Sequence, residues 1–253
     1  MGERFRLVGE NLRVFFHWIW WGGEGARTPW LRRIAVVLFA FLVPLPILYL
    51  LIFRFVPVPA TPQMLADLVT FQPVHHSWRA YDEISPHLAR AVVGSEDQNF
   101  CTHHGFDWKD IDKALKQHER HPKKRLRGAS TISQQVARTL FLLPARSWVR
   151  KGAEAYLTVL VETLWPKKRI LTAYLNLVDW GHGNYGAEAA SQAYFRVSAS
   201  ALSKAQAARL ATILPDPDKW RASRPGPYVA RRSETVESRA WEVTRDGLDW
   251  CVK

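Results

Sequence analysis

The stretch GASTISQQVARTLFLL, residues 128–143, decides the fold class of this chain. Thr131 and Gln134 have the spacing of a capping box, in which each side chain bonds the backbone N–H of the other residue, so a helix should begin there. Val136, Leu140 and Leu143 follow at helical spacing and form an apolar stripe. The stretch is therefore predicted to be an amphipathic helix that buries one face in a core.

The chain on either side of this helix has the same character. Ser85 as N-cap and Pro86 at the first helical position open a helix that should run toward Glu96. No segment shows sustained strand alternation, so the fold class is predicted to be all-α. Further helices are expected over residues 147–165, 167–178, 186–195 and 203–214. The basic string QHERHPKKRLR, residues 117–127, contains a proline and is expected to be a loop.

An uncharged stretch, IAVVLFAFLVPLPILYLLIF, occupies residues 34–53. About 20 apolar residues at 1.5 Å each match the roughly 30 Å core of a bilayer, so one transmembrane helix is predicted, kinked at Pro44 and Pro46. Arginines are concentrated before the stretch, which places residues 1–33 in the cytoplasm and the chain after residue 55 outside. The aromatic string FFHWIWW, residues 15–21, would lie in the membrane interface. A cleaved signal peptide is the alternative, but the stretch exceeds the roughly 7–15 apolar residues usual there.

Charge and cysteine content limit the possible functions. The chain has 253 residues and a net charge of +12, with 35 Lys and Arg against 23 Asp and Glu. This balance favours an anionic partner such as nucleic acid, acidic lipid or a phosphorylated substrate. DNA binding would rest on charge alone, because no recognition motif accompanies it. Two cysteines, Cys101 and Cys251, exclude a disulfide-stapled mini-protein and a Cys₄ zinc module, and whether they form a bridge stays open.

The string SEDQNFCTHHGFD, residues 95–107, is the first candidate for chemistry. Glu96 and Asp97 end a helix beside Phe100 and His103, and a carboxylate whose surroundings raise its pKa can act as a general base. A solvated acidic helix end is the ordinary structural reading of the same residues. The histidine pairs do not suggest a zinc site, because adjacent histidines share one ion poorly and no HExxH accompanies them.

Two further groups lie on the helices that follow. The capped helix presents free N–H groups at its start, which would suit an anion, and Thr131, Gln135 and Arg138 project from one face beyond it. An ordinary capped helix with a polar face explains the same pattern. On the next helix, Glu154 follows Arg150 by four residues and Lys151 by three, a spacing that allows ion pairs, although surface pairs of this kind are common and weak.

Together, these stretches resemble the peptidoglycan glycosyltransferase family, which polymerises lipid II into glycan strands. The resemblance runs from residue 75 to about residue 230 and includes EDQNFCTHHGFD, GASTISQQ, RKGAEA, KKRILTAYLN and GAEAASQAYF in the family's order. The short chain and its anchor are similar to the monofunctional biosynthetic type, and Ser-x-x-Lys and Lys-Thr/Ser-Gly motifs of a transpeptidase are absent from the sequence. The organisation expected is a cytoplasmic segment at 1–33, a transmembrane anchor at 34–54, a linker at 55–74, the glycosyltransferase domain at 75–230 and a C-terminal tail at 231–253.

The resemblance implies a lysozyme-like, two-lobed domain with a membrane-facing jaw, and it assigns roles to the residues above. Glu96 would be the general base that takes a proton from the 4-hydroxyl of the acceptor sugar, whose oxygen attacks C1 of the donor with inversion and expels undecaprenyl diphosphate. Glu154 would be the second catalytic carboxylate and would organise the diphosphate. The implied substrate-binding residues are Asp97, Phe100, His103, Thr131, Gln135, Arg138, Arg150 and Lys151.

The same resemblance implies partners and a location. A divalent cation, Mg²⁺ or Mn²⁺, is the only cofactor it leaves open, and no organic cofactor is expected. The partners would be lipid II, the growing glycan strand, the membrane and other proteins of cell-wall synthesis, with no nucleic acid. The location would be the bacterial inner membrane, with a single span and the catalytic domain on the periplasmic face. The basic string 117–127 would form a flap near the leaving group.

Two departures from the family pattern and two rival functions qualify this interpretation. Arg138 and Thr139 stand where many members have Lys-Asn; arginine keeps the charge and can bind phosphate bidentately, so Arg138 is retained as a diphosphate contact and Thr139 is not. Cys101 lies within the first motif and is assigned no role.

A glycan-cleaving enzyme on the same fold would use its carboxylate as an acid and need no diphosphate site. A catalytically inactive scaffold of the wall-building machinery is the other alternative.

Overall fold

The computed structural model describes residues 29–121, 130–145 and 147–253. The predicted interfacial string at 15–21 and the part of the basic flap at 122–127 lie outside the described residues, as does most of the cytoplasmic segment. The chain divides into two units, Met1–Ile52 and Phe53–Lys253.

The apolar segment forms helices α2 (Pro29–Leu42) and α3 (Pro44–Phe53), separated by a turn at Val43. The break falls directly before Pro44, which lacks the N–H that would continue the helical ladder. The run Arg33–Phe53 is 21 residues long with a mean hydropathy of 2.8, and 11% of its most apolar window is buried. Its length and composition fit a membrane-spanning helix, and they fit a signal sequence as well.

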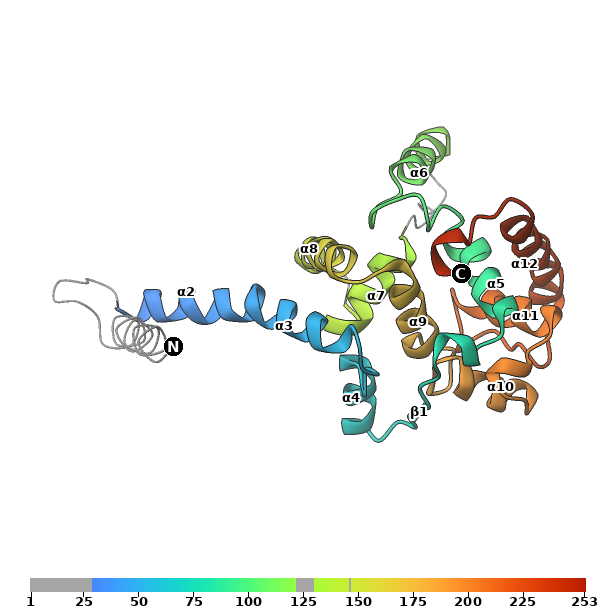
Figure 1. Cartoon of the computed structure of the whole chain (residues 1–253), viewed down its shortest axis with the longest axis horizontal. Coiled ribbons are helices and arrows are strands. Elements are labelled where there is room, and N and C mark those ends of the chain that lie inside the picture. The colour runs from blue at the N-terminus through green and yellow to red at the C-terminus, as the bar shows by residue number, and fades with distance from the viewer. Residues whose placement is uncertain (1–28, 122–129, 146) are drawn as a thin grey trace, which may run out of the picture. The chain divides into compact units, whose positions relative to one another are not determined.

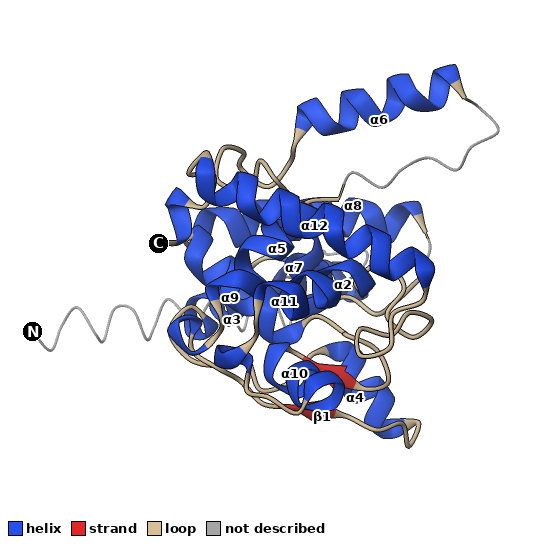
Figure 2. Cartoon of the chain, turned by 90° about the vertical axis from the view of Figure 1, so that its right-hand side faces the viewer, coloured by secondary structure: helices blue, strands red, loops and turns tan. Residues whose placement is uncertain are grey.

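Two groups of helices make up the second unit (Figure 1). Helix α5 (Pro86–Glu96) packs against α11 (Lys204–Ile213) and α12 (Pro227–Arg245), and α7 (Ile132–Phe141) packs against α8 (Trp148–Leu164) and α9 (Lys167–Leu177). Helices α4 (Pro62–Val69), α6 (Trp108–Arg120) and α10 (Ala187–Phe195), with the 3₁₀ turns η1 (Tyr81–Glu83), η2 (Ala199–Ala201) and η3 (Trp250–Val252), complete the helical elements described. Strands β1 (His75–His76) and β2 (Asn184–Tyr185) pair in parallel, and Figure 2 shows how little strand the described chain contains. The predicted all-α class is confirmed.

The helix ends follow the local signals in the sequence. The Thr131 hydroxyl accepts from the backbone N–H of Gln134, and the Gln134 side chain accepts from the N–H of Thr131, at 3.2 and 3.0 Å, so the predicted capping box is confirmed. Pro86 opens α5, which ends at Glu96 as expected. Helix α9 is buried from Ile170 through Leu177, and it packs against α7.

Three segments differ from the expectations. Gln117 belongs to α6, which continues to Arg120, so the basic string begins as a helix rather than as a loop. The expected linker contains α4, which is capped by Thr61 and buries Met64 against the domain. The expected tail supplies most of α12 and is part of the folded domain. This helix packs on α5 and α11 through a narrow buried stripe formed by Val229, Ser233, Val236 and Val243.

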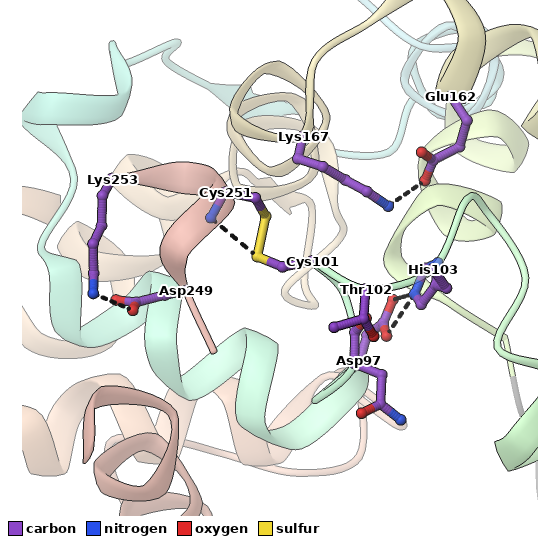
Figure 3. Close-up of a disulfide and its surroundings, with 10 residues drawn as sticks. Asp97, Cys101, Thr102, His103, Glu162, Lys167, Asp249, Cys251 and Lys253 are labelled. Carbon is purple, nitrogen blue, oxygen red and sulfur yellow. Dashed lines mark hydrogen bonds and ion pairs between the residues drawn. A yellow bond between two sulfur atoms is a disulfide. The ribbon is translucent and has the colours of Figure 1, made fainter. Parts of the chain in front are cut away.

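A disulfide joins Cys101 to Cys251 and resolves the question that the sequence left open (Figure 3). Cys101 lies in the loop after α5, and Cys251 lies in η3, which packs against α9. The backbone N–H of Cys251 also donates to the sulfur of Cys101 at 3.3 Å. The bond therefore ties the C-terminus to the loop that carries the first motif.

Candidate active site

Glu96 lies at the C-terminal end of α5, on the wall of a cleft of about 410 Å³. The cleft is lined by both helix groups and by α6. Gln135 comes from α7, Arg232 comes from α12, and Lys113 comes from α6. The end of α5 therefore brings a carboxylate to a space between the two groups that is large enough for part of a sugar substrate.

The Glu96 carboxylate is held by a short chain of hydrogen bonds. The side-chain N–H of Gln135 donates to Oε2 of Glu96 at 3.0 Å, and the Tyr174 hydroxyl donates to the carbonyl oxygen of Gln135 at 3.3 Å. Burial raises the pKa of the Glu96 carboxyl; the Gln135 hydrogen bond opposes the rise, the charge of Asp97 adds to it, and Arg232 and Arg138 oppose it. A carboxylate with a raised pKa is a better proton acceptor near neutral pH, which suits a general base.

Asp97 and His103 form a buried pair in the segment that follows Glu96 in the chain, and Figure 3 shows the two side chains facing each other. Nε2 of His103 lies 2.9 Å from Oδ1 and 3.0 Å from Oδ2 of Asp97, and the backbone N–H of Gly105 donates to Nδ1 of His103 at 3.1 Å. Because Nδ1 accepts, Nε2 carries the hydrogen and donates to the carboxylate. Gly105 has a φ of +92°, and a Cβ there would lie 2.9 Å from the Thr158 methyl group, so the turn requires glycine.

The N-terminus of α7 is occupied by the protein's own carboxylate, and the expectation that its N–H groups are free was wrong. The N–H of Ile132 donates to Oδ2 of Asp97 at 2.9 Å, and the N–H of Gln134 is capped by Thr131. The Thr131 hydroxyl also donates to the carbonyl of Gly105 at 2.7 Å. Asp97 therefore satisfies the positive end of the helix that was predicted to receive the anion of a ligand.

Phe100, the remaining predicted residue of the first motif, also lies in the protein interior. Phe100 is fully buried, and the ammonium of Lys167 lies 4.5 Å from its ring centroid. Lys167 in turn pairs with Glu162 at 2.7 Å. Phe100 and His103 therefore support the loop after α5 from the inside, whereas Asp97 also lines the cleft with Glu96.

Two arginines line a second hollow, of about 550 Å³, nearer the C-terminal end of α7. Arg138 comes from α7 and Arg150 from α8, so the predicted face of Thr131, Gln135 and Arg138 is divided between two spaces. Thr131 and Gln135 line the cleft with Glu96, whereas Arg138 lines the second hollow. The charge of Arg138 still acts on Glu96 and opposes the rise of its pKa. The two spaces are therefore electrostatically linked.

Glu154 is only 1% exposed and is bound by two cations. Arg150 donates to Oε2 at 3.1 Å, and Lys151 forms a very short ion pair with Oε1. Lys151 also reaches the Ser130 hydroxyl at 3.5 Å. The pairing expected from the sequence is present, but its carboxylate is buried while the two cations stay partly exposed.

The donor set around Glu154 does not fit a divalent cation, because both carboxylate oxygens face cationic side chains. Within residues 29–121, 130–145 and 147–253, no three or more His, Cys, Asp or Glu side chains are placed to hold a metal ion together. Glu154 instead fixes the position of Arg150 beside the second hollow.

Two site residues were missed by the sequence analysis. Tyr174 lies within the string KKRILTAYLN, where it looks like one more core residue of an apolar helix. Arg232 lies in the expected tail, yet it lines the cleft and acts on Glu96. The available signal was a basic residue between Val229 and Val236, close to the buried stripe of an amphipathic helix.

The amino-acid sequence of this chain is similar to those of known proteins. The transglycosylase family model matches residues 63–241. The chain is 48% identical over 222 residues to the biosynthetic peptidoglycan transglycosylase of Caulobacter vibrioides, covering 88% of this chain and 96% of the relative. It is 51% identical over 217 residues to the protein of the same name from Chromohalobacter salexigens, covering 82% and 92%. For the one from Pseudomonas aeruginosa the identity is 44% over 223 residues, covering 86% and 90%.

Proposed function

The chain belongs to the transglycosylase family, and from that premise we propose that it polymerises lipid II into linear peptidoglycan strands. The observation that carries the proposal is the position of Glu96. Its half-buried carboxylate, with a raised pKa, faces a cleft that adjoins a hollow lined by Arg138 and Arg150. A proton acceptor beside paired cations is what glycosyl transfer from a sugar diphosphate requires.

In the proposed reaction, Glu96 takes the proton from the 4-hydroxyl of the acceptor sugar. The resulting oxygen forms a bond to C1 of the donor while the bond from C1 to the diphosphate oxygen breaks. Attack from the face opposite the leaving group inverts the anomeric centre, and undecaprenyl diphosphate departs with the bonding electron pair. The carboxylate of Glu96 thus becomes a carboxylic acid and must return its proton to solvent before the next cycle.

The second hollow would hold the diphosphate. Negative charge grows on the leaving group as its bond to C1 breaks, and fixed guanidinium groups stabilise that charge most when they are already in place. Arg138 and Arg150 supply two such groups, and Glu154 prevents Arg150 from turning away. Glu154 would therefore act by holding cations, rather than by exchanging a proton with the sugar.

The domain is proposed to lie on the periplasmic face of the bacterial inner membrane, behind a single span. The arginines before residue 34 favour a cytoplasmic N-terminus. The disulfide between Cys101 and Cys251 is an independent argument, because such bonds persist in oxidising compartments and are rare in the cytosol.

Polymerisation of labelled lipid II by the purified chain tests the proposal. Glu96→Gln keeps the shape of the side chain but cannot take a proton, and it should lower the rate by about 10²–10⁴. Glu234→Gln is the matched control, because Glu234 is exposed on α12 and the same substitution there should leave the rate unchanged. Near-normal polymerisation by Glu96→Gln would remove Glu96 from this role. Degradation of finished glycan without polymer formation would favour a hydrolase, and inactivity toward both substrates would favour a scaffold.

A further inference from the structure

We propose that Tyr174 is a positioning residue for the general base, acting on Glu96 through the side-chain amide of Gln135. The proposal rests on the function proposed above, in which Glu96 takes a proton from the acceptor sugar. Tyr174 itself does not touch the substrate in this scheme. Its role is to fix which group of Gln135 faces Glu96, and which oxygen of Glu96 remains to accept the proton.

The three side chains form a continuous relay across the domain. The Tyr174 hydroxyl on α9 donates to Oε1 of Gln135 on α7 at 3.3 Å, and Nε2 of Gln135 donates to Oε2 of Glu96 on α5 at 3.0 Å. Tyr174 is 2% exposed, so its hydroxyl is held by packing and is shielded from competing water. The relay therefore connects the base on α5 to the buried helix α9 through α7.

The chemistry of each member fixes the direction of the relay. An ionised carboxylate only accepts hydrogen bonds, so the NH₂ group of Gln135 must face Glu96 and its carbonyl must face Tyr174. A donor on the carbonyl oxygen polarises the amide and strengthens its N–H groups as donors. Burial, followed by the charge of Glu96, raises the pKa of Tyr174 well above its usual value, so the hydroxyl keeps its proton. With Oε2 engaged, Oε1 is the oxygen that receives the proton of the substrate.

Other charges also act on Glu96, and the test must separate them from the relay. Asp97 follows it in the chain, Arg138 faces it from α7, and Arg232 faces it from α12. Across the same cleft, Asp107, Asp110 and Lys113 come from the start of α6 and the loop before it. Removing one hydroxyl group from Tyr174 changes the charge of none of these residues. A shift in the titration of Glu96 would then report on the relay.

The test compares four variants of the full chain with the wild type. Tyr174→Phe removes the hydroxyl and keeps the ring. Gln135→Met removes the direct donor, and the double variant removes both. Tyr194→Phe is the matched control, because the Tyr194 hydroxyl donates to the carbonyl of Trp180 at 2.8 Å, outside the relay. Thermal unfolding of each variant confirms that it is folded.

Two readouts follow Glu96 as the pH is changed. Water-soluble carbodiimide modifies protonated carboxyl groups, and mass spectrometry of the Glu96 peptide gives its titration midpoint without any substrate. The acid limb of kcat/KM for lipid II polymerisation gives the same midpoint from catalysis. Losing a donor to a carboxylate favours its neutral form, so the midpoint should rise by about half a pH unit in Tyr174→Phe and by about one unit in Gln135→Met. Tyr194→Phe should not shift it.

The double variant decides whether Tyr174 acts through Gln135. If it does, the double variant should match Gln135→Met alone, because the relay is already broken. An unchanged midpoint in Tyr174→Phe would overturn the proposal, and so would a further rise in the double variant. If labelling shows the shift but the wild type does not polymerise lipid II, the proposed function fails and the relay stands. If the wild type polymerises and no shift occurs, the relay fails and the function stands.

Discussion

Removing the disulfide should destabilise the domain far more than it impairs catalysis. The perturbation is the double substitution Cys101→Ser and Cys251→Ser. The bond joins residues 150 positions apart in the chain, so it restricts an unusually long loop of the unfolded chain. In the loop-entropy relation, a closed loop of that length corresponds to about 5 kcal/mol of stabilisation at 25 °C. For a domain of this size, each kcal/mol moves the Tm by about 2–4 °C, which gives an expected fall of about 10–20 °C.

The position of the bond explains why catalysis should survive. Cys101 lies in the loop after α5, five residues beyond Glu96, whereas Glu96 itself is held by α5 and by Gln135. Breaking the disulfide releases η3, which contributes neither of the contacts that hold Glu96. Polymerisation of lipid II, measured well below the new Tm, should therefore remain within about a few-fold of the wild type.

Tryptophan fluorescence of the full chain in detergent would record the unfolding transition, since the chain has 12 tryptophans. Reductant added to the wild type should reproduce the fall in Tm, and it should change nothing in the double-serine variant. A fall of less than about 2 °C would show that the bond does not constrain the unfolded chain to the extent that the loop-entropy relation gives. Free thiols in the full chain isolated from bacterial membranes would refute the bond itself, and with it the argument for an oxidising compartment.

Three further predictions concern the site and the membrane. Arg138→Ala should lower both kcat and affinity for lipid II, whereas Arg138→Lys should be milder because the charge survives; wild-type kinetics for Arg138→Ala would exclude a diphosphate contact. Asp97→Ala should lower the free energy of unfolding by about 2–4 kcal/mol, because it uncaps Ile132 and leaves His103 without its partner, and denaturant titration would measure the loss. Reporter fusions at residues 10 and 80 should place the first in the cytoplasm and the second in the periplasm, and a mature N-terminus near residue 61 would instead indicate a cleaved signal peptide.

Features set by residues within a few positions of one another could be predicted from the sequence alone. The capping box of Thr131 and Gln134, the opening of α5 at Pro86 and the apolar run at 34–53 each depend on spacing along the chain. Such signals determine where helices begin and end, and which elements the domain contains. They also carried the family resemblance, because its motifs are short strings. The all-α class and the family therefore followed from the sequence.

The partners within the site were decided only by tertiary packing. The N–H of Ile132 is bonded by Asp97, 35 residues earlier, so a helix start that looked open to an anion is filled. Gln135 is 39 residues from both Glu96 and Tyr174. No local pattern encodes these pairs, because a hydrogen bond between distant residues exists only once the helices are packed. For the same reason the segment expected to be a tail was not recognised as part of the domain. Its few buried residues are separated by charged ones, and they become buried only where α12 packs on α5 and α11.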